Sequence, residues 1–200
     1  MNEDKKFRNL ENNNQEEKSR SEFSLIEKVL ETRNILLSGE INKTLAERVV
    51  RQLILLEDRS DDPIRVFIDS PGGDADAGFA IFDMMRFVKP RIQIVGMGLV
   101  ASAAAIILLA APAEDRLGLP NSHYLIHQPL SGIRGVATEI EIHARELDKL
   151  RRKINELIAA ETGQAIDKVE KDTDRDYWMS AEEARKYGLI SRIISGRAEL

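Results

Sequence analysis

One serine stands alone in a long apolar segment of the chain. Residues 94–113 read IVGMGLVASAAAIILLAAPA, and Ser102 carries the only polar side chain among them. A buried hydroxyl without a hydrogen-bond partner costs about 1 to 3 kcal/mol, so this side chain is either paired or used in chemistry. Beside a general base, a serine hydroxyl can act as a nucleophile.

The other groups for such chemistry lie on either side of this segment. Residues 70–73 read SPGG, a predicted turn with two glycine amides, and residues 126–129 read IHQP, a histidine after an apolar run. Together with Ser102 they indicate a nucleophile, a base and a site that stabilises an oxyanion. The alternative is that Ser102 only caps a helix, a role in which serine is common.

The base must come from three histidines. His143 lies among charged residues of a predicted helix, which is typical of a solvent-exposed position. His123 and His127 share one face of a predicted strand, as residues four apart do. His127 ends that strand, where functional side chains reach the open edge of an α/β sheet, so we predict it as the base. A histidine at a strand end more often has a structural role, so this prediction depends on Ser102 and the glycine pair.

Composition indicates an enzyme domain that binds neither nucleic acid nor membranes. The 200 residues are 42% hydrophobic and carry a net charge of −5, without the stripe of Lys and Arg that nucleic-acid binding requires. The chain has no cysteine, which excludes disulfides and Cys-based zinc sites and fits a reducing, cytoplasmic compartment. Residues 94–113 are long enough to span a membrane, but Gly96, Gly98 and Pro112 favour a buried strand, a glycine turn and a helix.

The chain alternates between strand-like and helix-like segments. The predicted strands are Ile35–Leu37, Pro63–Asp69, Arg91–Val95 and His123–His127. Three helices are predicted at Leu45–Leu56, Gly78–Val88 and Ile166–Lys171. Two more are predicted, one from near Ser102 to Pro112 and one that begins at a capping box of Ser180 and Glu183 and ends at Gly188. This order predicts an α/β fold in which crossover helices pack on a mostly parallel sheet.

A long helix is predicted from Ala137 to Glu161, closed by Gly163. Its apolar stripe comprises Ile140, Leu147, Leu150, Ile154, Leu157 and Ile158. At 1.5 Å per residue the helix is about 37 Å long, more than a domain of this size covers, so we expect another subunit to cover it. The alternative is a surface helix that lies along its own domain.

The first 20 residues differ in composition from the rest of the chain. They carry five acids, five bases and five Asn, and bury too little apolar area to offset their ordering entropy, so we expect a flexible tail. A capping box at Ser24 and Glu27 predicts where structure begins.

Five motifs follow one another along the chain. They are SPGG, GLVAS around Ser102, LPNSHYLIHQP, EIEIHARE and KDTDRDYWMSAEEARKYGLI. From about Phe23 to Ile194 the chain resembles the proteolytic subunits of the caseinolytic (Clp) protease family. The resemblance implies an α/β, crotonase-like (ClpP-type) fold, a βαβ superhelix with a projecting handle helix. It implies one serine peptidase domain at 21–196 with a handle region at about 128–163, between a polar tail at 1–20 and a C-terminal tail at 197–200.

The resemblance implies a serine endopeptidase that cuts unfolded polypeptides without a metal or cofactor. Matched residue by residue, the motifs assign the nucleophile to Ser102, the general base to His127 and the orienting acid to Asp176. The backbone amides of Gly73 and Ala103 match the oxyanion hole of the family.

The resemblance also implies an assembly of two stacked heptameric rings. Gln128, Asp174 and Arg175 match positions of contact between subunits. Residues Gln128–Gly135 would form a strand beside the site that receives the substrate as an added β-strand. The rings would be fed by a hexameric AAA+ unfoldase such as ClpX, ClpA or ClpC, which uses the ATP. Phe67 and Phe87 are candidates for the docking cleft of that unfoldase, with a place in the core as the alternative.

The chain departs from the family pattern at several positions. Family members usually have Met-Gly after the nucleophile, where this chain has Ala103 and Ala104, so we expect a changed pocket and an intact main-chain oxyanion hole. Asp74 and Asp76 follow SPGG where less acidic residues are commoner, and residues 112–115 (PAED) replace a usually basic loop. Two alternatives remain. The two alanines leave open a low-activity paralogue that is a structural partner in a mixed ring, and the shared fold and oxyanion site leave open an acyl-CoA hydratase or isomerase of the crotonase fold.

Overall fold

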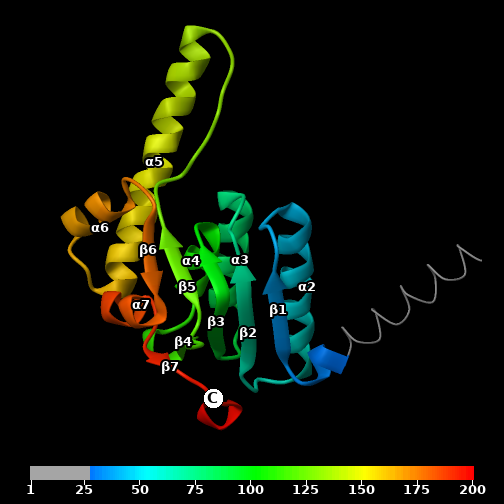
Figure 1. Cartoon of the computed structure of the whole chain (residues 1–200). Helices are drawn as coiled ribbons and strands as arrows, with labels where there is room; N and C mark the ends of the chain where they lie inside the picture. Colours follow the sequence, from blue (N-terminus) through cyan, green and yellow to red (C-terminus); the bar gives the residue numbers. More distant parts are fainter. Residues whose placement is uncertain (1–27) are drawn as a thin grey trace, which may run out of the picture.

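A computed structural model describes residues 28–200 of the chain. The tail predicted at 1–20 and the capping box at Ser24 and Glu27 lie outside these residues. The described chain forms a twisted sheet with helices packed against it and one long helix that projects from the body (Figure 1).

The sheet has seven strands. Five strands pair in parallel, in the spatial order β1 (Asn34–Ser38), β2 (Ile64–Ser70), β3 (Ile92–Ala101), β4 (Arg116–Gly118) and β7 (Arg192–Ile193). Strand β5 (His123–Ile126) also pairs in parallel with β3, and it pairs antiparallel with β6 (Tyr177–Ser180). The mostly parallel α/β sheet that the sequence predicted is confirmed.

Strand β3 is longer than the sequence predicted. The predicted strand ended before a glycine turn, but β3 continues through both glycines to the residue before Ser102. The prediction was wrong because the glycines allow close packing within a strand. A Cβ at Gly96 would lie 2.6 Å from the hydroxyl of Tyr124, and one at Gly98 would lie 2.6 Å from the carboxylate of Asp69. The extra length lets β3 pair with β4 at one end and with β5 at the other.

Two crossover helices link the first three strands. Helices α2 (Lys43–Arg59) and α3 (Ala75–Phe87) begin at Asn42 and Asp74, whose side chains accept backbone N–H groups of the first turn. Apolar residues at helical spacing bury one face of α2 in the core: Leu45, Val49, Leu53 and Leu56. Both helices begin a few residues earlier than the sequence predicted.

The long apolar segment divides into the end of β3 and a short helix. Helix α4 (Ala103–Leu108) is entirely buried and ends before Pro112, which precedes the 3-10 turn η1 (Ala113–Asp115). The predicted helix was therefore too long. In the part of the chain that the structure covers, no helix has the length and apolar character needed to cross a membrane.

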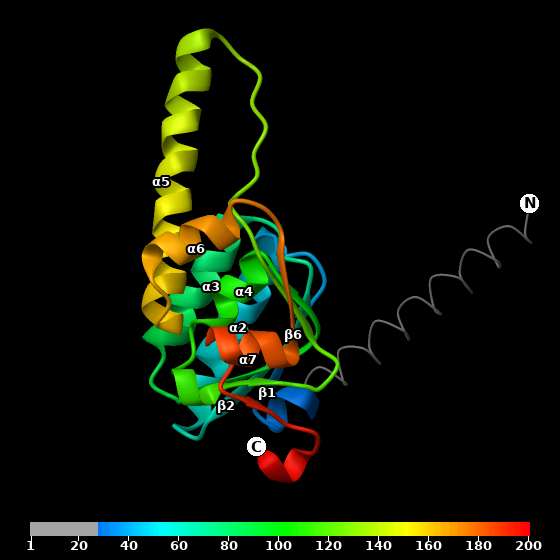
Figure 2. The same cartoon turned by 60° about the vertical axis from the view of Figure 1, so that its left-hand side comes forward.

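The long helix α5 (Ala137–Thr162) projects beyond the body in both views (Figures 1 and 2). Its 26 residues span about 39 Å. Ile154 and Ile158 near its C-terminal end are buried in the core, whereas Ile140 and Ile142 near its N-terminal end are exposed. The alternative of a helix lying along its own domain is therefore wrong for its first half. As predicted, Gly163 ends the helix in the left-handed conformation, with φ 73°.

The segment that leads into α5 is a loop. The family resemblance implied a strand at Gln128–Gly135, but residues 127–136 form no strand and run alongside α5 (Figure 2). Within residues 28–200, no strand pairs with this loop. After α5 follow α6 (Ile166–Thr173), α7 (Ala181–Tyr187) and the 3-10 turn η2 (Arg197–Glu199). The predicted capping box of α7 is confirmed, since Ser180 and Glu183 bond to each other's backbone N–H.

Candidate active site

Ser102 lies at a sharp turn between β3 and α4. Its backbone has φ 56° and ψ −121°, and within residues 28–200 only one other non-glycine residue, Arg33, has a positive φ. The turn is fixed from both sides: Ser102 N donates 2.9 Å to the carbonyl of Leu125, and the Ser102 carbonyl accepts from the amide of Ala105 at 3.0 Å. Although Ser102 precedes α4, its hydroxyl makes no capping hydrogen bond to the described helix. The alternative of a simple helix cap is therefore wrong.

The hydroxyl of Ser102 instead contacts a histidine. His127 directly follows β5, which pairs with the end of β3, and its Nε2 lies 2.8 Å from Ser102 Oγ. Its other ring nitrogen, Nδ1, lies 3.3 Å from Oδ1 of Asp176. The imidazole is 15% exposed and the carboxylate 61% exposed. This arrangement aims one nitrogen at the hydroxyl and presents the other to an acid that can hold the tautomer.

Strand pairing brings Asp176 opposite His127. Strands β5 and β6 are antiparallel, and the last pair in their register is Ile126 with Tyr177. The next residue of β5 and the preceding residue of β6 are His127 and Asp176, so extending the register by one step places them face to face.

A second set of contacts holds the loop before Asp176. Gln128 N donates 2.6 Å to the carbonyl of Thr173, and Gln128 Nε2 donates 2.6 Å to the carbonyl of Asp174. The buried hydroxyl of Thr173 lies 2.8 Å from Oδ1 of Asn155 on α5. Sequence reasoning missed Asn155 because a single buried amide on an amphipathic helix leaves no pattern.

The SPGG turn packs directly against the Ser102 turn. A Cβ at Gly72 would lie 2.6 Å from Ser102 Cβ, and one at Gly73, where φ is 149°, would lie 2.1 Å from the carbonyl oxygen of Ile41. Both glycines are therefore required. Ser70, which sequence reasoning passed over, supports this turn: its hydroxyl donates 2.6 Å to the carbonyl of Gly39 and accepts from Gly72 N at 3.1 Å.

Two backbone amides beside Ser102 are available to a ligand. Gly73 and Ala103 both line the same cleft as Ser102 and His127. Across the described chain, neither amide donates a hydrogen bond. Ala103 is the first residue of α4, where helix amides lack partners, so both amides can stabilise a negative oxygen.

The cleft has a volume of about 880 Å³ and extends from the glycine turn to α5. Its apolar wall is provided by Leu147, Leu150, Ile154 and Ile158 of α5, and the loop contributes Pro129 and Leu130. Ala103 lines the cleft, whereas Ala104 is fully buried in the core. Of the two alanines that depart from the family pattern, Ala103 is therefore the one that shapes the pocket.

The other residues singled out by sequence lie at different places. His123 is exposed, and His143 is only partly exposed, with Nε2 2.7 Å from Ser131 Oγ in a contact that solvent reaches. Phe67 packs partly against a small cluster with Val95 and Leu117, whereas Phe87 is 79% exposed, which excludes the core alternative for Phe87.

Arg175 is exposed beside the candidate acid. Its guanidinium donates 3.4 Å to the carbonyl of Asp174. From residue 28 onward the structure gives it no carboxylate within ion-pair distance, so the side chain is available to another chain.

Comparisons with known proteins agree with this geometry. The family model described as Clp protease matches residues 15–197. The chain is 62% identical to the ATP-dependent Clp protease proteolytic subunit 2 of Treponema denticola, covering 97% of this chain and 98% of the relative. It is 60% identical to the proteolytic subunit 2 of Treponema pallidum, covering 93% and 96%.

A solved structure gives the same result. A mutant of ClpP1 from Listeria monocytogenes superposes with a TM-score of 0.82 at 49% identity, covering 87% of this chain and 98% of that chain. Its fold matches the sheet and helices described above. The chain therefore belongs to the Clp protease family of serine endopeptidases, as a proteolytic subunit.

Proposed function

We propose that Ser102, His127 and Asp176 are the catalytic triad with which this Clp-family serine endopeptidase hydrolyses peptide bonds of unfolded polypeptides. The observation that carries the proposal is the line of contacts from Ser102 Oγ to His127 Nε2 at 2.8 Å and from His127 Nδ1 to Asp176 at 3.3 Å. Nucleophile, base and orienting acid thus stand in the order that acyl transfer requires.

The contacts define a role for each group. His127 Nε2 takes the proton of Ser102 as Oγ attacks the peptide carbonyl, and returns it to the leaving amine when the C–N bond breaks. Water then attacks the acyl-serine by the same route, with His127 again as base. Asp176 keeps the Nδ1 proton in place and stabilises the imidazolium form.

The oxyanion of each tetrahedral intermediate would lie between the amides of Gly73 and Ala103. One such donor lowers the barrier by about 2.7 to 4 kcal/mol. The helix α4 begins at Ala103, so its positive end faces the developing charge. Because hydroxyl, imidazole and amides supply nucleophile, base and electrophile, the proposed reaction needs neither metal nor cofactor.

A labelling experiment tests the triad. Ser102→Ala should abolish covalent labelling by a serine-reactive fluorophosphonate and lower peptide hydrolysis by several orders of magnitude, because the attacking atom is removed. Ser131→Ala is the matched control, since Ser131 lines the same cleft and should label like the parent. Labelling of the Ser102→Ala protein at another serine would refute the assignment.

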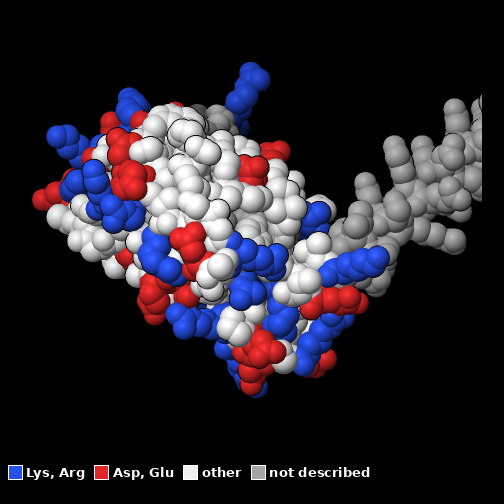
Figure 3. Space-filling model, turned by 60° about the horizontal axis from the view of Figure 1, so that its bottom comes forward, with Lys and Arg blue, Asp and Glu red and all other residues white. Residues whose placement is uncertain are grey.

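Surface features support the proposed assembly of two heptameric rings. Leu130, Val136, Ile140 and Ile142 expose apolar side chains on α5 and its loop. At the end of the molecule opposite the projecting helix, Figure 3 shows an area without Lys, Arg, Asp or Glu that is bordered by acidic and basic side chains. Within residues 28–200, no strand pairs with the loop at 128–135, so we expect it to be open to pairing with an extended substrate. The proposal also includes a cytoplasmic location. It includes an AAA+ unfoldase that uses ATP and docks near Phe67 and Phe87.

A mixed ring is the second candidate arrangement. It is favoured by Ala103, which replaces the family's long side chain on the cleft wall and reduces the area available to a large apolar substrate residue. Activity of the purified chain alone on short fluorogenic peptides, measured with its mass in solution, separates a homomeric enzyme from a partner subunit. The hydratase alternative does not explain the Ser102–His127 contact, because hydration of an acyl-CoA thioester shares only the oxyanion site with peptide hydrolysis.

A further inference from the structure

Two arginines hold the segment that follows the nucleophile helix. Helix α4 ends at Leu108, and the carbonyls of the three residues that follow it accept hydrogen bonds from two guanidinium groups. Arg86 Nη2 donates 3.1 Å to the carbonyl of Leu109, and Arg86 Nε donates 3.3 Å to that of Ala110. Arg116 Nε donates 2.8 Å to the carbonyl of Ala111. Side chains from α3 and β4 therefore hold the three residues that directly follow the C-terminal end of α4.

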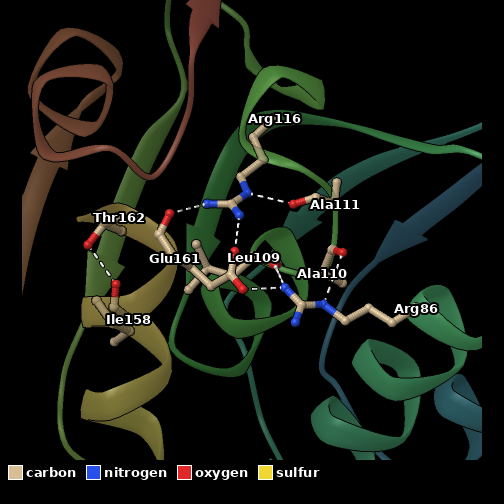
Figure 4. Close-up of polar contacts among 8 residues, drawn as sticks. All are labelled: Arg86, Leu109, Ala110, Ala111, Arg116, Ile158, Glu161 and Thr162. Carbon is tan, nitrogen blue, oxygen red and sulfur yellow. Dashed lines mark hydrogen bonds and ion pairs between the residues drawn. The ribbon is translucent and has the colours of Figure 1, made fainter. Parts of the chain in front are cut away.

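Both guanidinium groups meet one carboxylate from α5 (Figure 4). Glu161, in the last turn of α5, contacts Arg86 through Oε1 and Arg116 through Oε2. Arg116 Nη1 also donates 2.8 Å to the backbone carbonyl of Glu161. The Arg116 side chain is 1% exposed. Burial lowers its pKa, and Glu161 partly offsets this effect. A buried guanidinium needs its carboxylate, so this contact is firmly held.

The two helices joined in this way carry opposite sides of the cleft. At its N-terminal end α4 presents Ser102 and the amide of Ala103, while α5 supplies the apolar wall with Leu150 and Ile154. Helix α4 spans only about 9 Å and is buried on all sides, so it moves as one body. A displacement of its C-terminal end would therefore also displace Ser102 at its N-terminal end.

We propose that Glu161 is a positioning residue for acylation. Its carboxylate, shared by Arg86 and Arg116, sets where α4 places Ser102 and the Ala103 amide relative to α5. The inference rests on the proposed role of Ser102. A displacement of about 1 Å caused by a change far from the reacting atoms can lower the rate by about a hundredfold. The contacts of Glu161 with the two arginines can therefore control catalysis although they lie away from Ser102.

The test compares Glu161→Gln with Glu156→Gln. Glu156 is exposed on the same helix and forms no ion pair in residues 28–200, so its variant should match the parent. For Glu161→Gln we expect fluorophosphonate labelling of Ser102 and kcat to fall by about tenfold or more at 25 °C, with KM within about twofold. A merely structural contact would lower the Tm and leave the labelling rate below the Tm unchanged, which would overturn the proposal.

Arg86→Lys decides the question if Glu161→Gln does not fold. Arg86 is 42% exposed, so the variant should fold, and a lysine lacks the planar fork with which Arg86 bonds the carbonyls of Leu109 and Ala110 and the Glu161 carboxylate together. Labelling should slow, because the contact that joins α3 to Glu161 is lost. Labelling at the parent rate would overturn the inference. A parent protein that is not labelled at Ser102 would refute the proposed triad instead.

Discussion

At the scale of single residues, the candidate site depends on backbone conformations that are unfavourable for a residue with a side chain. Ser102 has φ 56°, a conformation that costs a non-glycine residue of order 1 to 3 kcal/mol. The bond from Ser102 N to the Leu125 carbonyl holds this turn, and the result is a hydroxyl aimed at His127. Gly72 and Gly73 in the adjacent turn are needed for a different reason, because neither position has room for a Cβ.

Gly73→Ala tests the oxyanion assignment. An added Cβ would lie 2.1 Å from the Ile41 carbonyl oxygen, so the turn must shift and carry its amide out of line. We expect kcat on a fluorogenic peptide to fall by about a hundredfold or more, as when one oxyanion donor is lost. Gly132→Ala is the control, because a Cβ there meets nothing within 4 Å. Parent-like kcat in Gly73→Ala would remove Gly73 from the site.

At the scale of elements, the strand pair β5 and β6 positions the base and the acid. Tyr124 of β5 fixes this pair against the sheet, because its ring fills the space left by Gly96 and Gly118. Its hydroxyl lies 3.0 Å from Ser122 Oγ. Burial raises the pKa of Tyr124 to about 12, above the value near 10 of an unfolded chain.

Tyr124→Phe should reduce the loss of stability at alkaline pH. Because the folded chain binds the phenolic proton more tightly than the unfolded chain, this contribution is complete below about pH 10 and is lost as pH rises toward about 12. Ser122 keeps its bond to the Leu119 carbonyl at 2.7 Å, so the variant should fold. Thermal unfolding of both proteins between about pH 9 and pH 11.5 measures the difference. Equal slopes of Tm against pH would contradict the role given to Tyr124.

At the scale of the whole molecule, the projecting helix and its loop expose apolar side chains. Ile140 and Ile142 of α5, and Val136 just before it, are exposed where no other element of the described chain covers them. Arg175 is exposed next to Asp176. If Asp176 is the orienting acid proposed above, a chain that binds Arg175 acts on the residue beside it, so we expect assembly and activity to be coupled.

Arg175→Ala should split the proposed double ring into heptamers and reduce turnover together. We expect a loss of about five- to 150-fold in kcat/KM, the usual range for coupling between sites. Light scattering of the separated protein gives the mass, and peptide hydrolysis gives the rate. Arg185→Ala is the control, because Arg185 pairs with Glu182 within α7. Single rings with full activity would show that assembly does not order the site.

The order of the helices, four of the seven strands and the first two members of the candidate site could be predicted from the amino-acid sequence. Apolar spacing located the helices and most strands, because 3.6-residue and two-residue periods record which face is buried. Ser102 could be singled out because a lone hydroxyl in an apolar segment is visible without a structure. His127 followed from the small number of histidines and its place at a strand end. Asp176 entered only through the likeness to a family.

The tertiary structure decided the contacts that join distant parts of the chain. The register of β5 with β6 brings Asp176 to His127, and the close approach of Tyr124 and Asp69 turns predicted turn glycines into strand residues. Glu161 reaches both arginines only because the C-terminal end of α5 lies beside α3 and β4. Local propensity and periodicity describe a residue's own segment, whereas these pairings depend on which surfaces meet in three dimensions. They become visible only in the folded chain.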